Sequence, residues 1–570
     1  APYRDWEQSG GLAITEYLFV MQDGNPMSPH LASSWEVADD GSKVTIGLKQ
    51  GIPWNSPEDA MGQDFGELTA EDVVWFINRQ NAFTNPTSTS GDAGDFAAVF
   101  GESRVIDAHT FEMDLQTPTY FGLPLSQFGI LGAAPSIRSK GVFDTMGEEW
   151  MRDHAVGTGP FIQGEWVNNE RGVAEAVPDH WNEPATIQTF IKLQIPENSS
   201  RVAMLKTGQA DIATLDFKLV PSLIQEGLSF LSSFPGGYVG QSILYPGNLW
   251  EEVHPITGEP LGSTAIAPDY VDPWLAPPYE EDIPWIGDPW QDMGKMGLYT
   301  DTDNPPGMTD MEQARKVRLA LGMAIDREAI NEVVLGGLGT PIYSEYMGPL
   351  YPGWEPNRVA PAMDWATGEI DDMMDGVPWT LPYDPDGAKA LLEEAGYPMG
   401  FDVTLQSYVA ETGEVTLEIA DIITSQWSQV GLNVVEKRED YGSVISPRMR
   451  QRVQFDPVVK NGDVNSNQFP KDWPYPPVDS ALSRPGWGVG FETPVLSSNH
   501  LEIRSSKDKA FREELHQQTA DYILYWQLYN GVYQIPKGVV VNPNRVSSWS
   551  SRPVHYGNVG TPQWIRLVGQ

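Results

Sequence analysis

A short segment in the last quarter of the chain carries side chains that suit the binding of a hydroxyl-rich ligand. It reads Asn-Gly-Asp-Val-Asn, and its amide and carboxylate groups can exchange hydrogen bonds with sugar hydroxyls. Aromatic rings offer flat faces on which the apolar side of a sugar ring can rest. The candidate contacts in this segment, after it and earlier in the chain are Asn461, Asp463, Asn465, Trp473, Tyr475, Tyr238 and Tyr245.

Two less specific interpretations stay open for these residues. The Asn-Gly-Asp run is also typical of a plain turn, because Asn and Asp bond to the nearby backbone and Gly tolerates positive φ. For each aromatic side chain taken alone, packing in a core is the more common role. The pattern therefore predicts a binding site only if the fold brings these side chains together.

A calcium-binding loop is the metal site that the acidic residues suggest first. Asp301, Asp303 and Glu312 occupy positions 1, 3 and 12 of that pattern. Pro305 and Pro306, however, stand where the loop needs a ligand and a glycine. We therefore expect no metal at this segment.

Motifs of catalysis are missing from the sequence. The glycine-rich run at 336–339 lacks the Lys-Ser/Thr pair that binds phosphate, and it suits the end of a helix. Neither H-E-x-x-H nor G-x-S-x-G occurs. The acid pairs at 371–372 and 393–394 are adjacent in sequence, so nothing makes them flank a glycosidic bond. We expect no catalytic residue and no cofactor, and keep a glycoside hydrolase as the enzyme alternative.

The charge balance excludes several kinds of partner. The 570 residues include 78 acidic against 36 basic ones, a formal charge of −42, and no Cys. Such a field repels nucleic acid and anionic headgroups, and it either keeps an exported protein soluble or suits a salty habitat. The absence of Cys excludes disulfides and thiolate metal sites. No apolar run of about 18 residues predicts a membrane span, and any export signal or lipid-anchoring Cys is expected upstream of residue 1.

Strand and helix signals alternate, which predicts a mixed α/β protein. Half-buried strands are predicted from alternating apolar residues. They cover Val44–Leu48, Phe111–Leu115, Ile191–Ile195 and Phe401–Leu405.

Helix starts are predicted where a side chain can accept from an unpaired backbone N–H. Thr69, Thr309 and Asp384 occupy such positions, with Glu312 completing a capping box after Thr309. The helix after Asp384 is expected to end at Gly396. A further core-facing helix is predicted around Ile419–Val430.

Two stretches interrupt this periodicity. Residues 245–309 contain 11 Pro among several Trp, and residues 467–488 have a similar composition. Their aromatic content argues against disorder. We expect the first to be an insertion on the surface, at the rim of a cleft.

Several separated segments resemble, in their order, the extracytoplasmic solute-binding proteins of ABC importers, family 5, the oligopeptide- and dipeptide-binding class. Residues 29–41 are similar to the family's P-x-LAxSWE…DG segment, 68–74 to LTAEDVV, and 157–161 to GTGPY. Residues 201–212 resemble ARVAALxSGEVDI, and residues 317–327 resemble VRQAL…AIDR. The resemblance spans most of the chain.

The resemblance implies an α/β fold with two lobes, the type II periplasmic-binding-protein fold, with an extra domain inserted in the first lobe. Ligand would lie between the lobes, and closure would be a hinge motion. The implied division is lobe I at 1–34, 156–245 and 533–570, the extra domain at 35–155, the Pro/Trp-rich insertion at 246–309, and lobe II at 310–532.

In the peptide-binding branch of this family, a Glu in a Tyr-Glu-Gly-Leu turn lines the cleft. The corresponding turn here is Thr15-Glu16-Tyr17-Leu18, with Glu16 19 positions before Trp35. Tyr17 replaces the usual Gly and would narrow the pocket or offer an aromatic face. A solvated turn carboxylate is the alternative for Glu16.

The same branch pairs the ligand's ammonium group with an Asp, whose place falls on Asn465 here. A buried ammonium without a counter-ion costs on the order of several kcal/mol. Either Asp463 takes over this role or the ligand has no free amine. The resemblance thus implies a peptide-sized solute, an oligopeptide or an oligosaccharide, captured by an extracytoplasmic monomer whose other partners are ABC permease subunits.

Overall fold

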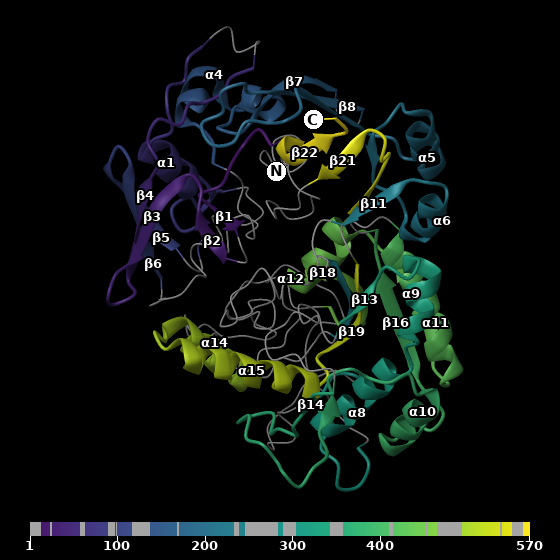
Figure 1. Cartoon of the computed structure of the whole chain (residues 1–570). Helices are drawn as coiled ribbons and strands as arrows, with labels where there is room; N and C mark the ends of the chain where they lie inside the picture. Colours follow the sequence, from purple (N-terminus) through teal and green to yellow (C-terminus); the bar gives the residue numbers. More distant parts are fainter. Residues whose placement is uncertain are drawn as a thin grey trace.

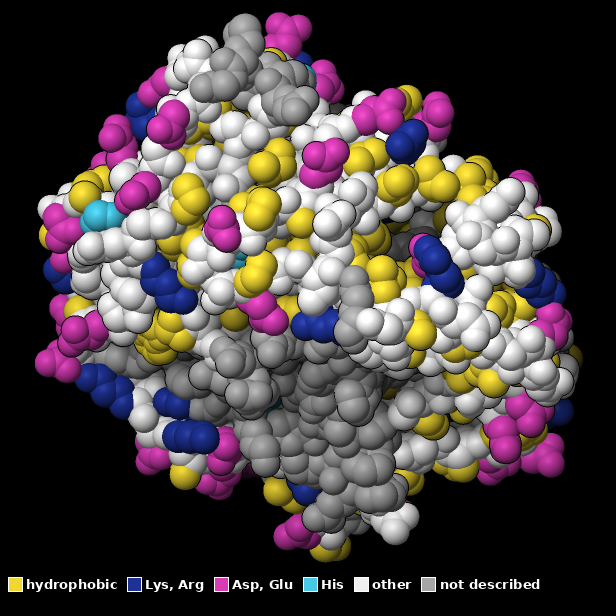
Figure 2. Space-filling model, turned by 45° about the horizontal axis from the view of Figure 1, so that its top comes forward, with side chains coloured by type: hydrophobic (Ala, Val, Ile, Leu, Met, Phe, Trp, Pro, Cys, Tyr) yellow, Lys and Arg dark blue, Asp and Glu magenta, His cyan; other side chains and the backbone are white. Residues whose placement is uncertain are grey.

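The protein is a mixed α/β molecule with two lobes, one above the other in Figure 1. The computed structural model describes the following residues: 13–22, 25–57, 63–88, 97, 100–116, 137–167, 170–232, 239–245, 283–288, 304–342, 357–409, 414–450, 454–463, 493–535, 538–549 and 562–569. Acidic side chains are scattered over the face shown in Figure 2, with fewer basic ones among them. None of the helices among these residues is long and apolar enough to cross a bilayer.

One part of the upper lobe is a four-stranded antiparallel sheet covered by helices. Its order is β3-β4-β6-β5. Val44, Ile46 and Leu48 are buried on one face, which confirms the strand predicted from their alternation. The elements are β3 (Ala32–Val37), β4 (Lys43–Leu48), β5 (Phe100–Asp107), β6 (Thr110–Leu115), α1 (Ala70–Gln80) and α4 (Lys140–Asp153).

Asp72 joins the starts of α1 and α4. The backbone N–H and the hydroxyl of Thr69 both donate to its carboxylate at 3.0 Å. The backbone N–H of Lys140 donates to the same carboxylate at 2.8 Å. The helix start predicted at Thr69 is therefore confirmed, and its acidic residue also fixes the second helix.

Small sheets make up the rest of the upper lobe. They are the hairpin β1-β2, the sheets β7-β8-β9 and β10-β20-β11, and the pair β21-β22. The strands are β1 (Phe19–Gln22), β2 (Asn25–Pro29), β7 (Phe161–Val167), β8 (Arg171–Ala176), β9 (Thr189–Leu193), β10 (Ile212–Ala213), β11 (Ser229–Ser232), β20 (Gly538–Val541), β21 (Val546–Trp549) and β22 (Ile565–Leu567). The helices are α5 (Asn198–Thr207), η3 (Phe217–Leu219), α6 (Val220–Gln225) and η6 (Pro562–Trp564).

The strand predicted around Ile191 exists, but its burial was predicted wrongly. Ile191 and Leu193 are 49% and 43% exposed on the edge strand β9, and Ile195 lies beyond the end of the strand. Periodicity shows which side chains share a face, but it does not show whether another layer covers that face.

A six-stranded sheet forms the centre of the lower lobe. Its order is β13-β19-β12-β18-β16-β17, with β16 parallel to β17 and β18 and the other pairs antiparallel. The strands are β12 (Val239–Leu244), β13 (Thr340–Pro341), β16 (Asp402–Ser407), β17 (Asn433–Arg438), β18 (Val458–Asp463) and β19 (Tyr529–Ile535), and a small separate pair is β14 (Val359–Ala360) and β15 (Val377–Pro378). The helices are α8 (Asp310–Met323), α9 (Arg327–Leu335), α10 (Pro385–Glu394), α11 (Val415–Gln429), the π-helical η4 (Tyr441–Ile445), α12 (Ser446–Arg450), α14 (Pro494–Ser505) and α15 (Lys509–Tyr525).

The helix starts predicted in the lower lobe are confirmed, with one difference. Asp384 accepts from the N–H of Gly387, and α10 ends before Gly396, whose φ is 91°. Thr309 accepts from the N–H of Glu312, but the carboxylate of Glu312 bonds to Arg315 at 2.6 and 2.7 Å. Because Arg315 is a charged partner, it displaces the reciprocal bond of the capping box.

Along the described residues, the chain changes from one lobe to the other at two places. One joins β11 to β12, and the other joins β19 to β20. The structure thus places β12 in the sheet of the lower lobe, whereas the division implied by the family resemblance gave residues up to 245 to the first lobe. β19 likewise continues in the lower sheet to Ile535, past the expected boundary at 533, because both strands pair with each other along their length.

Part of the Pro- and Trp-rich stretch lies inside the lower lobe, which corrects the expectation of a surface insertion for residues 283–288. Trp285 and Ile286 belong to its core. The indole N–H of Trp285 donates to the carbonyl of Phe455 at 2.8 Å, and the Trp285 carbonyl accepts from buried Arg318 at 2.8 Å. A large apolar side chain with a satisfied N–H is stable in a core, and composition alone did not reveal this.

The turn before β7 requires glycine at two positions. The N–H of Gly159 donates to the carbonyl of Ile14 at 2.9 Å, and Asn55 bonds to the carbonyls of both Gly157 and Gly159. A Cβ at Gly159 would lie 2.3 Å from the Ala13 carbonyl oxygen, and one at Gly157 would lie 2.0 Å from that of Ile14. The turn therefore lies directly against residues 13–16.

We expect Gly159→Ala to destabilise the protein by about 2 kcal/mol, because the new methyl group must push two backbone segments apart. Gly141→Ala is the matched control, since a Cβ at this helical position meets no atom closer than 3.5 Å. Chemical denaturation of both variants and the parent measures the difference. Equal stability of the two variants would contradict the packing described for this turn.

Candidate functional site

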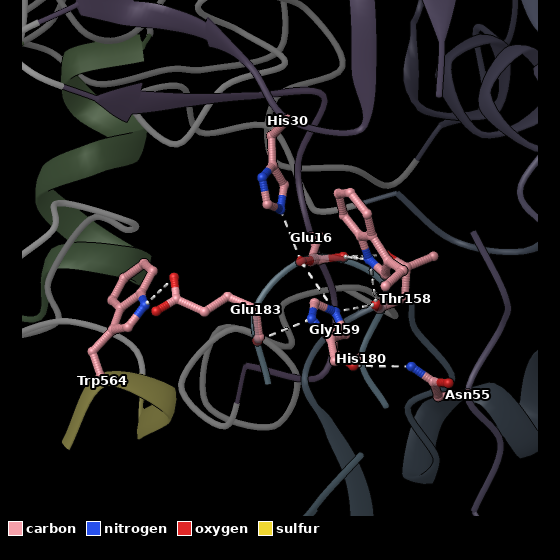
Figure 3. A network of polar contacts seen from close by, with 9 residues as sticks. Glu16, His30, Asn55, Thr158, Gly159, His180, Glu183 and Trp564 are labelled. Carbon is pink, nitrogen blue, oxygen red and sulfur yellow. Dashed lines mark hydrogen bonds and ion pairs between the residues drawn. The ribbon is translucent and has the colours of Figure 1, made fainter. Parts of the chain in front are cut away.

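Glu16 lies at the centre of a buried polar network in the upper lobe (Figure 3). Its Oε1 lies 2.8 Å from Nε2 of His30. Its Oε2 accepts from the hydroxyl of Thr158 and from the indole N–H of Trp181, both at 2.9 Å. The residue is 8% exposed, which excludes a solvated turn carboxylate. Both oxygens therefore have partners inside the lobe.

Four separate segments bring these side chains together. Glu16 precedes β1, and His30 follows β2, where its backbone N–H bonds to the Leu18 carbonyl at 2.9 Å. Thr158 lies in the glycine turn before β7, and His180 and Trp181 follow β8. The hairpin and the glycine turn thus fix the carboxylate and its donors in one place.

His180 lies next to Glu16, and both of its ring nitrogens face carbonyl oxygens. Its Nδ1 lies 3.1 Å from the Glu183 carbonyl oxygen, and its Nε2 lies 3.0 Å from that of Thr158. Carbonyl oxygens only accept, so the ring donates to them. Oε1 of Glu16 lies 3.7 Å from Nε2.

The environment keeps Glu16 ionised. Burial by itself would raise its pKa, but the charges and hydrogen bonds of His30 and His180 outweigh burial and lower the pKa to about 2. The network therefore holds a carboxylate at any physiological pH.

Lys49 lies beside this network, at the end of β4. Its Nζ is 5.0 Å from the ring centroid of Trp181, in cation–π geometry. The rings of Trp181 and His30 are 5.2 Å apart, centroid to centroid. Partial burial lowers the pKa of Lys49, and the charge of Glu16 opposes this effect. A lysine, an imidazole and an indole thus adjoin one carboxylate.

Tyr17 is buried next to Glu16 and faces the interior. It is 6% exposed, and burial raises the pKa of its hydroxyl against the opposing positive charge of Arg138. In this conformation its ring packs inside the lobe.

Asn461 lies on β18 of the lower lobe, in a second polar group. Its Oδ1 accepts from the amide of Gln241 at 2.9 Å, and Gln241 in turn accepts from the Thr416 hydroxyl at 3.2 Å. Its backbone N–H donates to the Tyr408 hydroxyl at 3.0 Å, and the Tyr408 ring lies 4.7 Å from that of Tyr441. Amides and hydroxyls, without a carboxylate, make up this group.

The remaining sequence candidates are placed as follows. Tyr245 lies fully buried in the core of the lower lobe, bonded to Asn530, so core packing describes it in this conformation. Asp463 ends β18, but its side chain lies outside the described residues. Tyr238, Asn465, Trp473 and Tyr475 also lie outside them, as do Asp301 and Asp303 of the rejected calcium pattern.

Across the described ranges, no group of three or more His, Asp or Glu side chains is arranged to hold a metal ion. Glu312, the described acid of the calcium pattern, pairs with Arg315.

Sequence reasoning missed His30, His180, Thr158 and Lys49. His30 and Thr158 lie within segments that carried the family resemblance, but their positions gave no sign of contact with Glu16. A histidine without a motif partner nearby in sequence carries no signal, and the bond between His30 and Glu16 spans 14 positions.

We expect Glu16→Gln to destabilise the protein at neutral pH and to change its response to acid. Because the folded pKa, about 2, is below the ordinary 4.5, Glu16 contributes stability above pH 4.5 that is lost as the pH falls toward 2. The difference in unfolding free energy between parent and variant should therefore shrink between pH 5 and pH 2 by on the order of 3 kcal/mol. Denaturant titrations at several pH values measure it. Glu165→Gln, at an exposed pair with Arg171, is the control and should show little change; a constant difference for Glu16→Gln would refute the assignment.

Comparison with known proteins shows which proteins this chain is similar to. The middle region of the bacterial extracellular solute-binding proteins, family 5, matches residues 26–240 and 292–484. The chain is 25% identical over 421 residues to heme-binding protein A of Haemophilus influenzae, covering 71% of this chain and 61% of that protein. It is 24% identical over 431 residues to the dipeptide-binding protein of Escherichia coli, covering 73% and 64%. The chain thus spans about three fifths of the length of these curated relatives.

A solved structure agrees with the fold. The ABC transporter-associated periplasmic binding protein DppA of Helicobacter pylori, in complex with the peptide STSA, superposes with a TM-score of 0.66. The superposition covers 97% of this chain and 92% of that one at 17% sequence identity. Since the family match covers well over half of the chain and includes elements of both lobes, the protein belongs to the bacterial extracellular solute-binding proteins, family 5.

Proposed function

We propose that the protein is the solute-binding subunit of an ABC import system, which captures a peptide-sized solute between its two lobes and delivers it to the membrane permease. The observation that carries this proposal is the family match, which extends over elements of both lobes. A hinge between the lobes would let them close, and a solute would shift the protein toward the closed form by its greater affinity for that form.

A peptide is the solute that the similar proteins favour. One relative is a dipeptide-binding protein, and one similar structure holds the peptide STSA. Asp463 then supplies the counter-charge for the ligand's ammonium group, since it lies two positions before the expected Asp. The proposed site comprises Asn461 together with Tyr238, Asn465, Trp473 and Tyr475. Glu16, Tyr17 and Tyr245 were also expected there from the sequence, but they are buried within their own lobes in this conformation.

An oligosaccharide is the second candidate, and one observation favours it. Asn465 stands where a peptide binder has its Asp, and the described polar group around Asn461 contains only neutral side chains. Neutral amides and hydroxyls suit sugar hydroxyls.

The cellular setting follows from the same proposal. We place the protein outside the cytoplasm, as a monomer, with permease subunits as its partners and with no role for nucleic acid. A lipid anchor through a Cys upstream of residue 1 belongs to this proposal, and so does the absence of catalysis.

We expect mixed di- to pentapeptides to raise the melting temperature of the protein, because a ligand that binds only the folded state stabilises it. Asp463→Asn should abolish the shift if this carboxylate meets the ammonium group. Asp402→Asn is the control, since this exposed carboxylate on the neighbouring β16 bonds to Asn433. A shift by oligosaccharides but not by peptides would reject the peptide and favour the second candidate, and turnover of the sugar would establish the hydrolase instead.

A further inference from the structure

We propose that Lys49 and Trp181, with His30 as a wall, form a subsite for an anionic oxygen group of the solute, such as a carboxylate. This inference rests on the proposed function, which leaves the charge of the solute open. It differs from the site expected by resemblance, in which Glu16 would face the ligand.

Glu16 is not free to receive a cationic ligand group. A carboxylate offers about four acceptor positions. Here the hydroxyl of Thr158, the indole N–H of Trp181 and the ring of His30 lie within 2.9 Å of its two oxygens. His180 lies beside it, with both ring nitrogens facing carbonyl oxygens. Groups of the protein itself therefore occupy most of the acceptor positions of Glu16.

Lys49 is a cation beside this network. It contacts the Trp181 ring and is attracted over a longer distance by Glu16, and it forms no ion pair with any carboxylate of the described residues. Seven other lysines of the described residues do have such partners. They are Lys43, Lys140, Lys206, Lys218, Lys316, Lys507 and Lys509.

Partial burial makes a counter-ion valuable at Lys49. A cation that has lost part of its hydration gains more from an anion than a fully solvated one does. Trp181 holds the ammonium group by its ring face, while its N–H is bound to Glu16. The side chain is thus held in place before any ligand arrives, which reduces the entropy lost on binding.

The neighbours of Lys49 indicate the shape of the group that would bind. The half-buried rings of Trp181 and His30 lie 5.2 Å apart and tilted by 55°. They offer apolar surface beside the ammonium group, which suits a carboxylate carried on a short aliphatic or peptide stem. The ring of His30 is bound to Glu16 through Nε2. Its other nitrogen, Nδ1, forms no hydrogen bond with the described residues.

The test compares trialanine with its amide, which lacks the terminal negative charge, and adds two small anions that are not peptides. Calorimetric titration of the parent with trialanine, trialanine C-terminal amide, succinate and inorganic phosphate shows which anions bind. Lys49→Gln should weaken the binding of the free-acid probes at least about tenfold and leave the binding of the amide unchanged. Lys49→Arg should retain the preference for the free acid, and Lys192→Gln, at an exposed position of β9, should match the parent.

The outcomes separate this inference from the proposed function. If trialanine does not bind but succinate or phosphate binds in a Lys49-dependent way, the subsite is supported and the proposal that the solute is a peptide is rejected. If trialanine and its amide bind the parent equally, if Lys49→Gln binds the free acid as well as the parent does, or if no anionic probe binds at all, the subsite is refuted. Unliganded melts of each variant verify that the fold is intact.

Discussion

The upper lobe depends on an ionised carboxylate that is held away from water. An isolated buried charge would be expelled or neutralised, so Glu16 can stay ionised only while its donors remain in position. These donors come from segments separated by 142 and 165 positions from Glu16. A single side chain therefore makes the placement of the N-terminal segment, the glycine turn and the loop after β8 mutually dependent.

The glycine turn shows how this dependence extends to the backbone. Gly157 and Gly159 let the strand entering β7 approach residues 13–16 closely enough for the Thr158 hydroxyl to reach the carboxylate. Asn55 fixes the same turn from the other side. Glu183, whose carbonyl faces His180, also accepts through its side chain from the indole of Trp564, which connects the network to the C-terminal segment (Figure 3).

Local signals in the sequence predicted much of the fold, and the limits have physical reasons. Thr69 and Asp384 start helices as predicted, because a cap depends on residues three positions away. The place of β12 between β18 and β19 depends on pairing across more than two hundred residues, which no local pattern contains. Spacing singled out Glu16, but His30 and His180 could not be predicted as its partners. Trp285 was misjudged because proline-rich composition hides a buried side chain.

The two polar groups differ in chemistry, and each is complete within one lobe. The group around Glu16 lies wholly in the upper lobe, and the one around Asn461 wholly in the lower lobe. A hinge motion between the lobes would therefore break neither group. Each lobe would present groups already positioned by its own hydrogen bonds, so that closure orders few side chains and loses little entropy. A charged group in one lobe and neutral amides in the other would also orient an asymmetric solute, since only one of its ends suits each side.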